Sequence, residues 1–433
     1  MKKVLKKIRK TLWKFVQRIF HLDKIYRHRA KRLFKKRAQK KKKTGDPITV
    51  SFVCHDPALW VMFESVYNAM EKDSRFYPQV IVLPNKQDRF SRKRFRETGM
   101  EKYCDHLGLN MVEGFDTSRM KWKKPTDFDS DYLFYQKPYP FFPKAWSVAR
   151  VSRRAKICHI PYGFGLFEWD GFYTMNVPEL FLKYTSFVFH ENTTMQQSLK
   201  KRCGNKPWFS RVQTRVTGYP KFDYLDYYKD LNGSVWRRGL TPNVKRILWT
   251  PRWNTSEGNC HFFEYKDFFQ HFCSKNKHID FVFRPHPLCF QNFLKTDELS
   301  EKELENMRLD YASSSGMFID ESYNYQDTFL TSDILVSDTS SMLIEYFLTG
   351  KPIIYTYKLA ATIDFGKEFA EGFYWVKNEA ELRETLNRLI QGKDPLFERR
   401  KRIIQDMIYR PEGGAGERVK ELLYEDFLQE ITS

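Results

Sequence analysis

The sequence lacks any apolar stretch long enough to cross a bilayer. A transmembrane helix needs ~20 consecutive, mostly apolar residues, and no segment of the 433-residue chain approaches that length. The basic residues at the start of the chain are also not followed by the apolar core of a secretory signal. Both absences argue against an integral membrane protein and against a secreted one.

Cysteine is scarce, and its spacing predicts no cross-links. The seven cysteines are odd in number, scattered, and include no C-x-x-C pair. The pattern therefore predicts neither a disulfide framework nor a zinc site, and it fits a reducing, cytosolic compartment. The acidic run DFDSD at 127–131 lies in a stretch that looks like a loop. No cluster in the sequence requires a metal or any other cofactor.

Net charge is nearly absent outside the first 43 residues. Those residues hold 20 of the 74 Lys and Arg residues and only one of the 53 acidic residues, a net charge of +19. The other 390 residues carry 54 basic and 52 acidic residues, a net charge of +2. A nearly neutral body argues against a nucleic-acid-binding surface on the globular part of the chain.

The basic N-terminal segment, residues 1–46, has the pattern of an amphipathic helix. Leu5, Ile8, Leu12, Val16 and Ile19 lie on one helical face, and Lys and Arg fill most of the rest. Such a helix favours a membrane interface, and the basic block that follows adds attraction to anionic lipids. We expect residues 1–43 to hold the protein on the cytoplasmic face of the cell membrane. A helix packed on the protein's own body and a nucleic-acid arm remain alternatives.

The rest of the chain alternates apolar strands with amphipathic helices. This alternation predicts an α/β fold with parallel sheets covered on both faces. Turn and linker segments divide the sequence into a domain at 47–232, a second βα domain at 243–410, and a last helix within 411–433 that has no strand after it. That helix is a candidate to pack back across the domain joint.

One strand–turn–helix–strand unit, Thr331–Thr356, carries the clearest ligand pattern. ILV forms a buried strand, SDTSS follows at 337–341, and Gly350 with Pro352 ends the helix. Ligands of open parallel sheets bind at the carboxyl ends of strands, and backbone N–H groups at a helix start favour a phosphate. Glu345 lies one turn further along the same face, suited to ribose hydroxyls. A plain helix cap and an ordinary surface glutamate are the alternatives.

Other candidate residues also end predicted strands. Arg284 and His286 belong to RPHP, whose prolines place the motif at a strand end. An arginine fork suits a diphosphate, and a histidine suits proton transfer or a phosphate contact. His55 and His159 end strands of the first domain in the same way. A purely structural role is the alternative for each of these histidines.

Five motifs in this order resemble the CDP-glycerol glycerophosphotransferase family of teichoic-acid and capsule polysaccharide synthesis in the cell wall. That family shows GYPRND, a TPTW-like turn, a histidine–proline pair, S-D-Y-S-S with a carboxylate four residues on, and R-G-F-Y. The likeness covers about residues 155–375. The motifs here are GYPKFD (218–223), ILWTPRW (247–253), FRPHP (283–287), SDTSSMLIEYFLTGKPIIY (337–355) and EGFYW (371–375).

The resemblance implies a GT-B-like architecture, two Rossmann-like doubly wound domains facing across a cleft, the first binding the acceptor and the second the nucleotide. It also implies two catalytic histidines, one from each domain. His286 matches the second. His159 is the match for the first, although the usual W-H-G-T reads CHIPYG here, and His55 stays an alternative. The implied substrate-binding residues are Arg252, Arg284, Ser337, Asp338, Thr339, Ser340, Ser341 and Glu345.

The implied reaction is transfer of an alditol phosphate from CDP-glycerol or another CDP-alditol to a lipid-linked glycan acceptor, with release of CMP. The resemblance implies no metal, no cofactor and no nucleic-acid partner. Two other classes stay open. One is a GT-B glycosyltransferase or sugar-nucleotide epimerase that uses a nucleotide sugar. The other is a non-catalytic nucleic-acid-binding protein with a basic arm.

Overall fold

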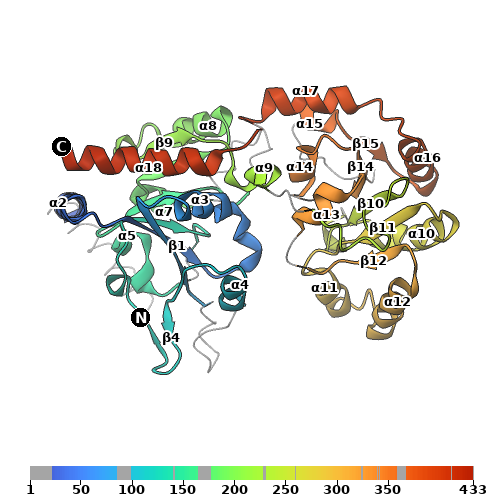
Figure 1. The fold of residues 1–433 in the computed structure, drawn as a ribbon, viewed down its shortest axis with the longest axis horizontal. Helices are drawn as coiled ribbons and strands as arrows, with labels where there is room; N and C mark the ends of the chain where they lie inside the picture. Colours follow the sequence, from blue (N-terminus) through green and yellow to red (C-terminus); the bar gives the residue numbers. More distant parts are fainter. Residues whose placement is uncertain are drawn as a thin grey trace, which may run out of the picture. The chain divides into compact units, whose positions relative to one another are not determined.

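The structure is a computed structural model, and it divides the chain into two compact units (Figure 1). Unit 1 comprises 1–162, 170–220 and 415–433, and unit 2 comprises 163–169 and 221–414. Each unit is described by itself. The expected amphipathic helix at 5–19 lies outside the described residues, as do Thr339 and Ser341. The residues that the structure describes are 22–84, 99–139, 142–163, 177–227, 231–258, 260–322, 325–338, 340, 342–357, 367–410 and 412–432.

Unit 1 is built on a seven-stranded parallel sheet with the order β3-β2-β1-β6-β7-β8-β9. Every residue of its interior strand β1, Ile48–Cys54, is buried. A strand buried on both faces is mostly apolar, and only Thr49 and Ser51 are polar in ITVSFVC. The other strands are β2 Phe76–Val82, β3 Met111–Glu113, β6 Tyr132–Tyr135, β7 Lys156–His159, β8 Phe187–His190 and β9 Gln213–Val216, and β4 Phe115–Asp116 with β5 Lys121–Trp122 forms a separate antiparallel hairpin.

Helices accompany the strands of unit 1 in the alternation expected from the sequence. The C-terminal helix α18 belongs to this unit, where it packs against α3 and α2. The hydroxyl of Tyr132 on β6 donates to Asp426 of α18 (2.6 Å). The last segment of the chain thus completes the unit in which the chain begins. The helices are α2 Leu22–Thr44, α3 Val61–Glu71, α4 Met100–His106, α5 Val148–Val151, α7 Glu179–Tyr184, α8 Thr193–Cys203 and α18 Ala415–Thr432.

Unit 2 holds a six-stranded parallel sheet with the order β12-β11-β10-β13-β14-β15. Its strands are β10 Lys245–Thr250, β11 Ile279–Phe283, β12 Met317–Ile319, β13 Ile334–Ser337, β14 Ile353–Thr356 and β15 Tyr374–Val376. Its helices are α9 Tyr224–Tyr227, α10 Phe262–Lys275, α11 Cys289–Lys295, α12 Glu301–Ser313, α13 Gln326–Thr331, α14 Met342–Phe347, α15 Lys367–Ala370, α16 Glu379–Ile390 and α17 Phe397–Met407.

Aromatic side chains fill much of the core of unit 2. Trp249 on β10 lies 4.8 Å from Phe269, 4.9 Å from Phe283 and 5.5 Å from Phe262, measured between ring centroids. Its neighbour Leu248 points to the opposite face, because successive side chains of a strand alternate, and it is equally buried. Both faces of the sheet are therefore covered, as a doubly wound fold requires. No helix in the described ranges combines the length and apolarity needed to span a bilayer.

Helix α2 covers the basic block that follows the expected N-terminal helix, and it packs on unit 1. Phe34 and Ala38 are buried, and the ring of Phe34 meets Tyr132 edge-on at 5.6 Å. Lys41 Nζ donates to Asp131 (2.9 Å), and Arg37 Nε donates to the other oxygen of that carboxylate (2.6 Å). Among the possibilities that the sequence left open, packing on the protein's own body holds for one face of this helix.

Candidate active site

Four loops leave the carboxyl edge of the unit 2 sheet beside one another. Strands β12, β11, β10 and β13 are neighbours in that order, so the residues that follow them share one edge. Arg252 comes after β10, Arg284 after β11, Asp320 after β12 and Asp338 after β13. The sheet thus brings together three of the residues that the sequence predicted for the donor, and it adds Asp320.

Ser337 and Asp338 are buried beneath this edge. The Ser337 hydroxyl donates to the carbonyl of Thr250 (2.7 Å). Asp338 is 1% exposed, and its two oxygens accept the backbone N–H groups of Arg252 (2.6 Å) and His261 (3.0 Å). Burial raises the pKa of Asp338 to about 8, against the opposing effect of these hydrogen bonds. Both side chains hold loops together, and a direct contact of either with the donor stays a prediction.

The turn after β13 continues into α14 through Ser340. The Ser340 hydroxyl accepts a hydrogen bond from the N–H of Met342 (3.2 Å) at the start of that helix. This is the capping role that the sequence left open. Thr339 and Ser341 lie outside the described residues. A phosphate contact at this turn stays a prediction.

Arg284 is paired with a carboxylate that the sequence analysis did not single out. Its Nη1 donates to Asp320, and its Nη2 donates to the carbonyl of Ser322 (2.6 Å). Asp320 is buried and also accepts the hydroxyl of Thr328 (3.0 Å). The guanidinium lies 5.8 Å from the ring centroid of Tyr325. A diphosphate that bound Arg284 would therefore contact a guanidinium group that Asp320 already holds in place.

His286 is exposed, and one of its ring nitrogens already has a hydrogen-bond partner. Nδ1 accepts the backbone N–H of Leu288 (3.1 Å), so a neutral ring carries its proton on Nε2 and offers a donor there. The ring stacks on Trp253 with centroids 5.7 Å apart. Loss of water around the ring, and then the charge of Arg252, lower the pKa of His286. Near neutral pH it is a hydrogen-bond donor without a net charge.

Glu345 is buried and has two partners. Lys221 donates to Oε1, and the hydroxyl of Tyr325 donates to Oε2. Lys221 belongs to the GYPKFD motif, and its ammonium also lies 5.7 Å from the ring centroid of Tyr325. A hydrogen bond from Glu345 to a ribose stays a prediction. The carboxylate is not the ordinary surface glutamate that the sequence allowed.

Three buried histidines lie at the carboxyl ends of unit 1 strands: His55 follows β1, and His159 and His190 end the neighbouring strands β7 and β8. The side chain of His159 is 1% exposed, and neither of its ring nitrogens has a hydrogen-bond partner within the described residues. Burial lowers the pKa of His159 to about 3. Burial and then Lys137 lower the pKa of His55 to about 4, and burial and then His159 lower that of His190 to about 3. These rings are neutral and weakly basic.

Sequence reasoning missed His190, Lys221 and Asp320. A signal for His190 was available, because FVFH ends in a histidine in the same way as ITVSFVCH and KICH do. Lys221 was noted only as a departure from the family motif. Asp320 follows a short strand and carries no motif of its own, so only the sheet order identifies it.

The acidic run at 127–131 is used for structure. Asp131 accepts Lys41 and Arg37 as described above, and Asp129 lies 3.1 Å from Lys41. In the part of the chain that the structure describes, no group of three or more His, Cys, Asp or Glu side chains is placed to hold a metal ion.

The family model "CDP-Glycerol:Poly(glycerophosphate) glycerophosphotransferase" matches residues 183–425, more than half of the chain. The chain belongs to this family. The match includes the five motifs and all six strands of the unit 2 sheet. It includes His190 but neither His159 nor His55. The family resemblance expected from the motifs is confirmed, and the chain is a transferase of the glycerophosphotransferase family.

Several solved structures are similar to this chain in fold at low sequence identity. The wall teichoic acid polymerase TagF, as its H444N variant, has a TM-score of 0.58 at 12% identity and covers 98% of this chain and 99% of its own. MnaA of S. aureus, solved with UDP, has a TM-score of 0.56 at 14% identity, with 89% and 98% covered. UDP-GlcNAc 2-epimerase of Neisseria meningitidis, solved with UDP-GlcNAc, has a TM-score of 0.56 at 16% identity, with 88% and 100% covered. None of the curated proteins compared with the chain matches it.

These similarities establish the fold and the family to different extents. At 12–16% identity the neighbours show the fold alone, which is the GT-B-like α/β architecture expected from the sequence. Family membership comes from the family model and its motifs. The function assigned below therefore depends on the family and on the geometry of this chain's own residues.

Proposed function

We propose that this glycerophosphotransferase-family protein transfers an alditol phosphate from a CDP-alditol, such as CDP-glycerol, to a hydroxyl of a membrane-linked glycan or polymer. The acceptor oxygen forms a bond to the β-phosphorus, and the bond from that phosphorus to the bridging oxygen breaks. CMP leaves with the bridging oxygen, and the proton of the acceptor hydroxyl passes to a base. The product belongs to cell-wall or capsule polysaccharide synthesis.

One observation carries the proposal. At the carboxyl edge of the unit 2 sheet, Arg252, Arg284 and His286 follow the neighbouring strands β10 and β11, beside the turn that follows β13. Phosphoryl transfer needs little covalent chemistry from a protein, and it is accelerated mainly by positioning and by charge stabilisation. Two guanidinium groups and an imidazole donor supply that stabilisation for a diphosphate.

His286 is assigned to the leaving phosphate. Its Nδ1 accepts the Leu288 N–H, which leaves Nε2 as the protonated nitrogen of the neutral ring. Through this N–H, the neutral imidazole can stabilise the charge that develops on the departing CMP oxygen by donating a hydrogen bond to it. Arg252, whose charge lowers the pKa of His286, favours this neutral state.

The acceptor base is assigned to a histidine of unit 1, with His159 first and His55 second. The family resemblance supports this assignment, and the neutral state of both rings is the state that a base requires. A pKa of about 3 makes His159 a weak base in the structure as it stands. Access of water or acceptor to the ring would raise that pKa toward its ordinary value.

A membrane-bound acceptor accounts for the concentration of basic residues at one end of the chain. The first 43 residues carry a net charge of +19 on a chain whose remainder is nearly neutral. We assign the protein to the cytoplasmic face of the cell membrane, where its N-terminal segment would hold it beside a lipid-linked glycan.

The test uses purified full-length chain with CDP-glycerol or CDP-ribitol and a lipid-linked acceptor, and measures CMP release. We expect CMP release that depends on the acceptor. A parallel competition experiment compares CDP-linked with UDP-linked ligands, and we expect the cytidine compounds to bind more tightly. Tighter binding of UDP-sugars, with no CMP release, would instead identify an enzyme that uses a nucleotide sugar.

A further inference from the structure

Helix α2 is fixed on unit 1 along one face, so the residues on its opposite face are the ones exposed to solvent. Phe34 lies against Tyr132 and Phe427, and Lys41 donates to Thr49 (2.8 Å) and Asp131 on the body of the unit. The four anchoring residues Phe34, Arg37, Ala38 and Lys41 are spaced by three, one and three, which is one side of a helix. The helix is therefore a fixed part of the surface of unit 1.

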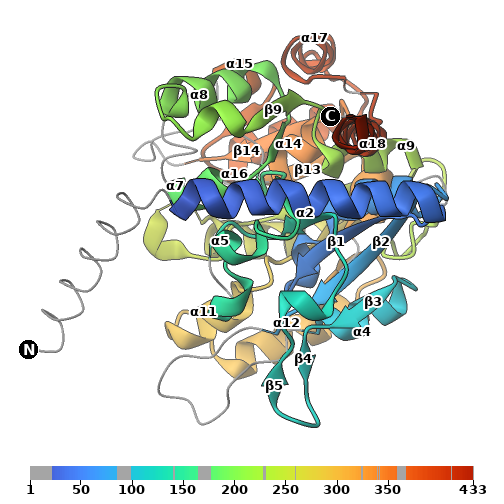
Figure 2. The ribbon, with the colours of Figure 1, turned by 90° about the vertical axis from the view of Figure 1, so that its left-hand side faces the viewer.

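The opposite face of α2 is exposed and basic. Arg29, Arg32, Lys36, Lys40 and Lys43 follow one another at intervals of three and four residues, and all are exposed. Leu33 lies among them with 55% of its surface exposed. Figure 2 shows α2 running beside α5 of the same unit. A basic helical face with an exposed leucine matches the boundary between lipid headgroups and acyl chains.

A groove joins this face to the loop that follows α5. It has a volume of about 440 Å³ and is lined by Arg29, Leu33, Arg150, Arg153 and Arg154. We call it the arginine groove. Among the described residues, no carboxylate forms an ion pair with Arg29, Arg150 or Arg154, whereas Arg37 nearby is paired with Asp129 and Asp131. Part of the positive charge of the groove is therefore available to an anion.

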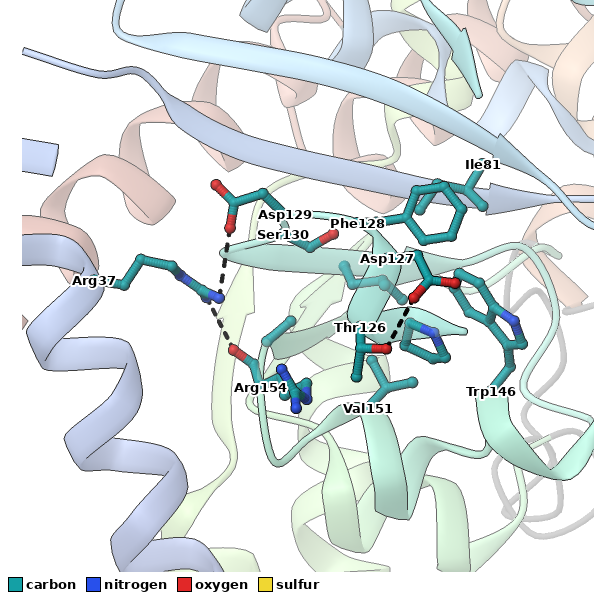
Figure 3. Close-up of a pocket in the computed structure, with 13 residues that line it drawn as sticks. Arg37, Ile81, Thr126, Asp127, Phe128, Asp129, Ser130, Trp146, Val151 and Arg154 are labelled. Carbon is teal, nitrogen blue, oxygen red and sulfur yellow. Dashed lines mark hydrogen bonds and ion pairs between the residues drawn. The ribbon is translucent and has the colours of Figure 1, made fainter. Parts of the chain in front are cut away.

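Arg154 also lines a second cavity, of about 270 Å³ (Figure 3). Arg37 lines this cavity as well, and its Nη2 donates to the carbonyl of Arg154 (2.9 Å). Asp127, Phe128 and Trp146 line the far side of this cavity. The cavity lies near the starts of β6 and β7, at the edge of the sheet opposite to His159, so it is separate from the predicted catalytic residues.

We propose that the arginine groove, together with the exposed face of α2, binds the phosphate-bearing headgroups of an anionic bilayer. The guanidinium groups would contact phosphates, the arginine stems would cover apolar surface, and Leu33 would enter the acyl boundary. Among the residues that the structure describes, none that lines the groove is an aromatic on which a base could stack, which favours lipid over nucleic acid. This inference extends the proposed function, because it names the surface that would place the enzyme beside its acceptor.

The first experiment measures binding of the full-length chain to vesicles of phosphatidylcholine alone and of equimolar phosphatidylcholine and phosphatidylglycerol. Each basic residue near an anionic leaflet strengthens binding about fivefold, so Arg150→Ala with Arg154→Ala should weaken binding to the anionic vesicles about 30-fold. The matched control is Lys295→Ala with Lys302→Ala. It removes the same charge from exposed positions of unit 2 and should change binding less than twofold.

Four results would overturn the proposal. An equal effect of the control would assign binding to net charge alone, and unchanged binding of the double arginine variant would show that the groove takes no part. Release of the protein from vesicles by inorganic phosphate, at a concentration equal to that of the lipid phosphate, would make the groove a site for free phosphate. Retained vesicle binding together with lost RNA binding in the double arginine variant would assign the groove to nucleic acid.

The second experiment reports on the same surface without removing a charge. All seven native cysteines are buried, so a thiol introduced by Leu33→Cys can be labelled selectively with an environment-sensitive fluorophore. We expect a blue shift with anionic vesicles, and none for Leu309→Cys, whose native side chain is 61% exposed on α12 of unit 2. A Leu33→Cys label that stays in water on vesicle-bound protein would contradict the proposal.

The inference and the proposed function can fail separately. CMP release with a soluble acceptor analogue and no vesicles should be the same for the wild type and for Arg150→Ala with Arg154→Ala. Absence of CMP release from any CDP-alditol would remove the proposed function and leave the vesicle result intact. Normal release with no arginine-dependent vesicle binding would remove the inference alone.

Discussion

The two units place histidines at the same topological position in opposite environments. Unit 1 ends β7 and β8 with His159 and His190, which are buried and have pKa values lowered to about 3. Unit 2 follows β11 with His286, which is exposed, hydrogen-bonded through Nδ1 and under the influence of the charge of Arg252. The same strand-end position thus gives a dry, weakly basic ring in one unit and a held donor in the other.

The difference teaches that a strand end marks where a ligand can bind. Exposure to water and hydrogen-bond partners then decide whether a histidine at that position can contact a ligand. His286 is held by a backbone donor and faces outward beside charged groups. His159 has no hydrogen-bond partner among the described residues, so burying it neutral costs stability that unit 1 must offset elsewhere. The predictions below test this contrast, from the largest expected effect to the smallest.

The first prediction concerns the histidine beside the arginines. His286→Ala should lower CMP release about 10²- to 10³-fold, the usual effect of removing one preorganised hydrogen-bond donor to developing charge. The measurement is steady-state CMP release at saturating CDP-alditol. The control is His278→Ala, an exposed histidine that immediately precedes the same strand β11 at its other end. Normal turnover by the His286 variant would end its assignment.

The second prediction concerns the buried histidines and acid. Their pKa values are lowered on folding, so their neutral states favour the native protein above pH 6.5, and this stability is lost as the pH falls toward their folded pKa values. His159 and His190 should each cost about 2 kcal/mol of unfolding free energy between pH 6.5 and pH 5.

The measurement is urea unfolding of the full-length chain at several pH values in that window. His159→Gln with His190→Gln removes both titrating groups, and should flatten the pH dependence whatever it does to the absolute stability. A wild type whose unfolding free energy is the same at pH 6.5 and pH 5 would show that these rings are not neutral and buried in solution.

The third prediction separates two roles for Glu345. If its carboxylate holds the ribose, Glu345→Gln should raise the KM for the CDP-alditol about tenfold and leave kcat within about twofold, because a hydrogen bond to a charged group contributes ~1.5–3 kcal/mol. Lys221→Met breaks the same ion pair but leaves the carboxylate in place. Equal effects of the two variants would show that Glu345 serves mainly to hold Lys221.

The fourth prediction concerns the shape of the Arg284 contact. Arg284→Lys keeps the charge beside Asp320 but loses the second arm of the fork on the Ser322 carbonyl. We expect a three- to tenfold rise in the KM for the CDP-alditol, about 1 kcal/mol. The matched variant is Arg238→Lys, which alters another Arg–Asp pair of unit 2, with Asp280, and should leave the KM unchanged. Identical kinetics of Arg284→Lys and the wild type would exclude a role for the fork in donor binding.

Much of the fold was accessible from the sequence because its signals are local. The apolar runs of β1, β10, β11 and β13, and the polar residues that end them, are each contained in fewer than ten residues. The motifs of unit 2 were therefore placed at strand ends before the structure was known. The family model confirms the resemblance that those motifs carried.

The partners of the site residues were not accessible, because they come from distant parts of the chain. Lys221 reaches Glu345 across 124 residues, and Arg284 reaches Asp320 only because β11 and β12 are neighbours. The anchoring of α2 was only an alternative in the sequence analysis, for a different reason. Its composition is so basic that charge dominates the pattern, while its contact with unit 1 depends on Phe34, Ala38 and one ion-pair cluster around Asp131.

The return of α18 to unit 1 has a consequence for synthesis on the ribosome. Every residue from 221 to 414 is translated before α18 begins at Ala415, so the later unit can fold while the earlier one still lacks a helix. The sheet made first would wait, with the surface that α18 covers on α3 unprotected, until α18 has left the exit tunnel. Completion of unit 1 is thereby tied to a helix that is made after the whole of unit 2.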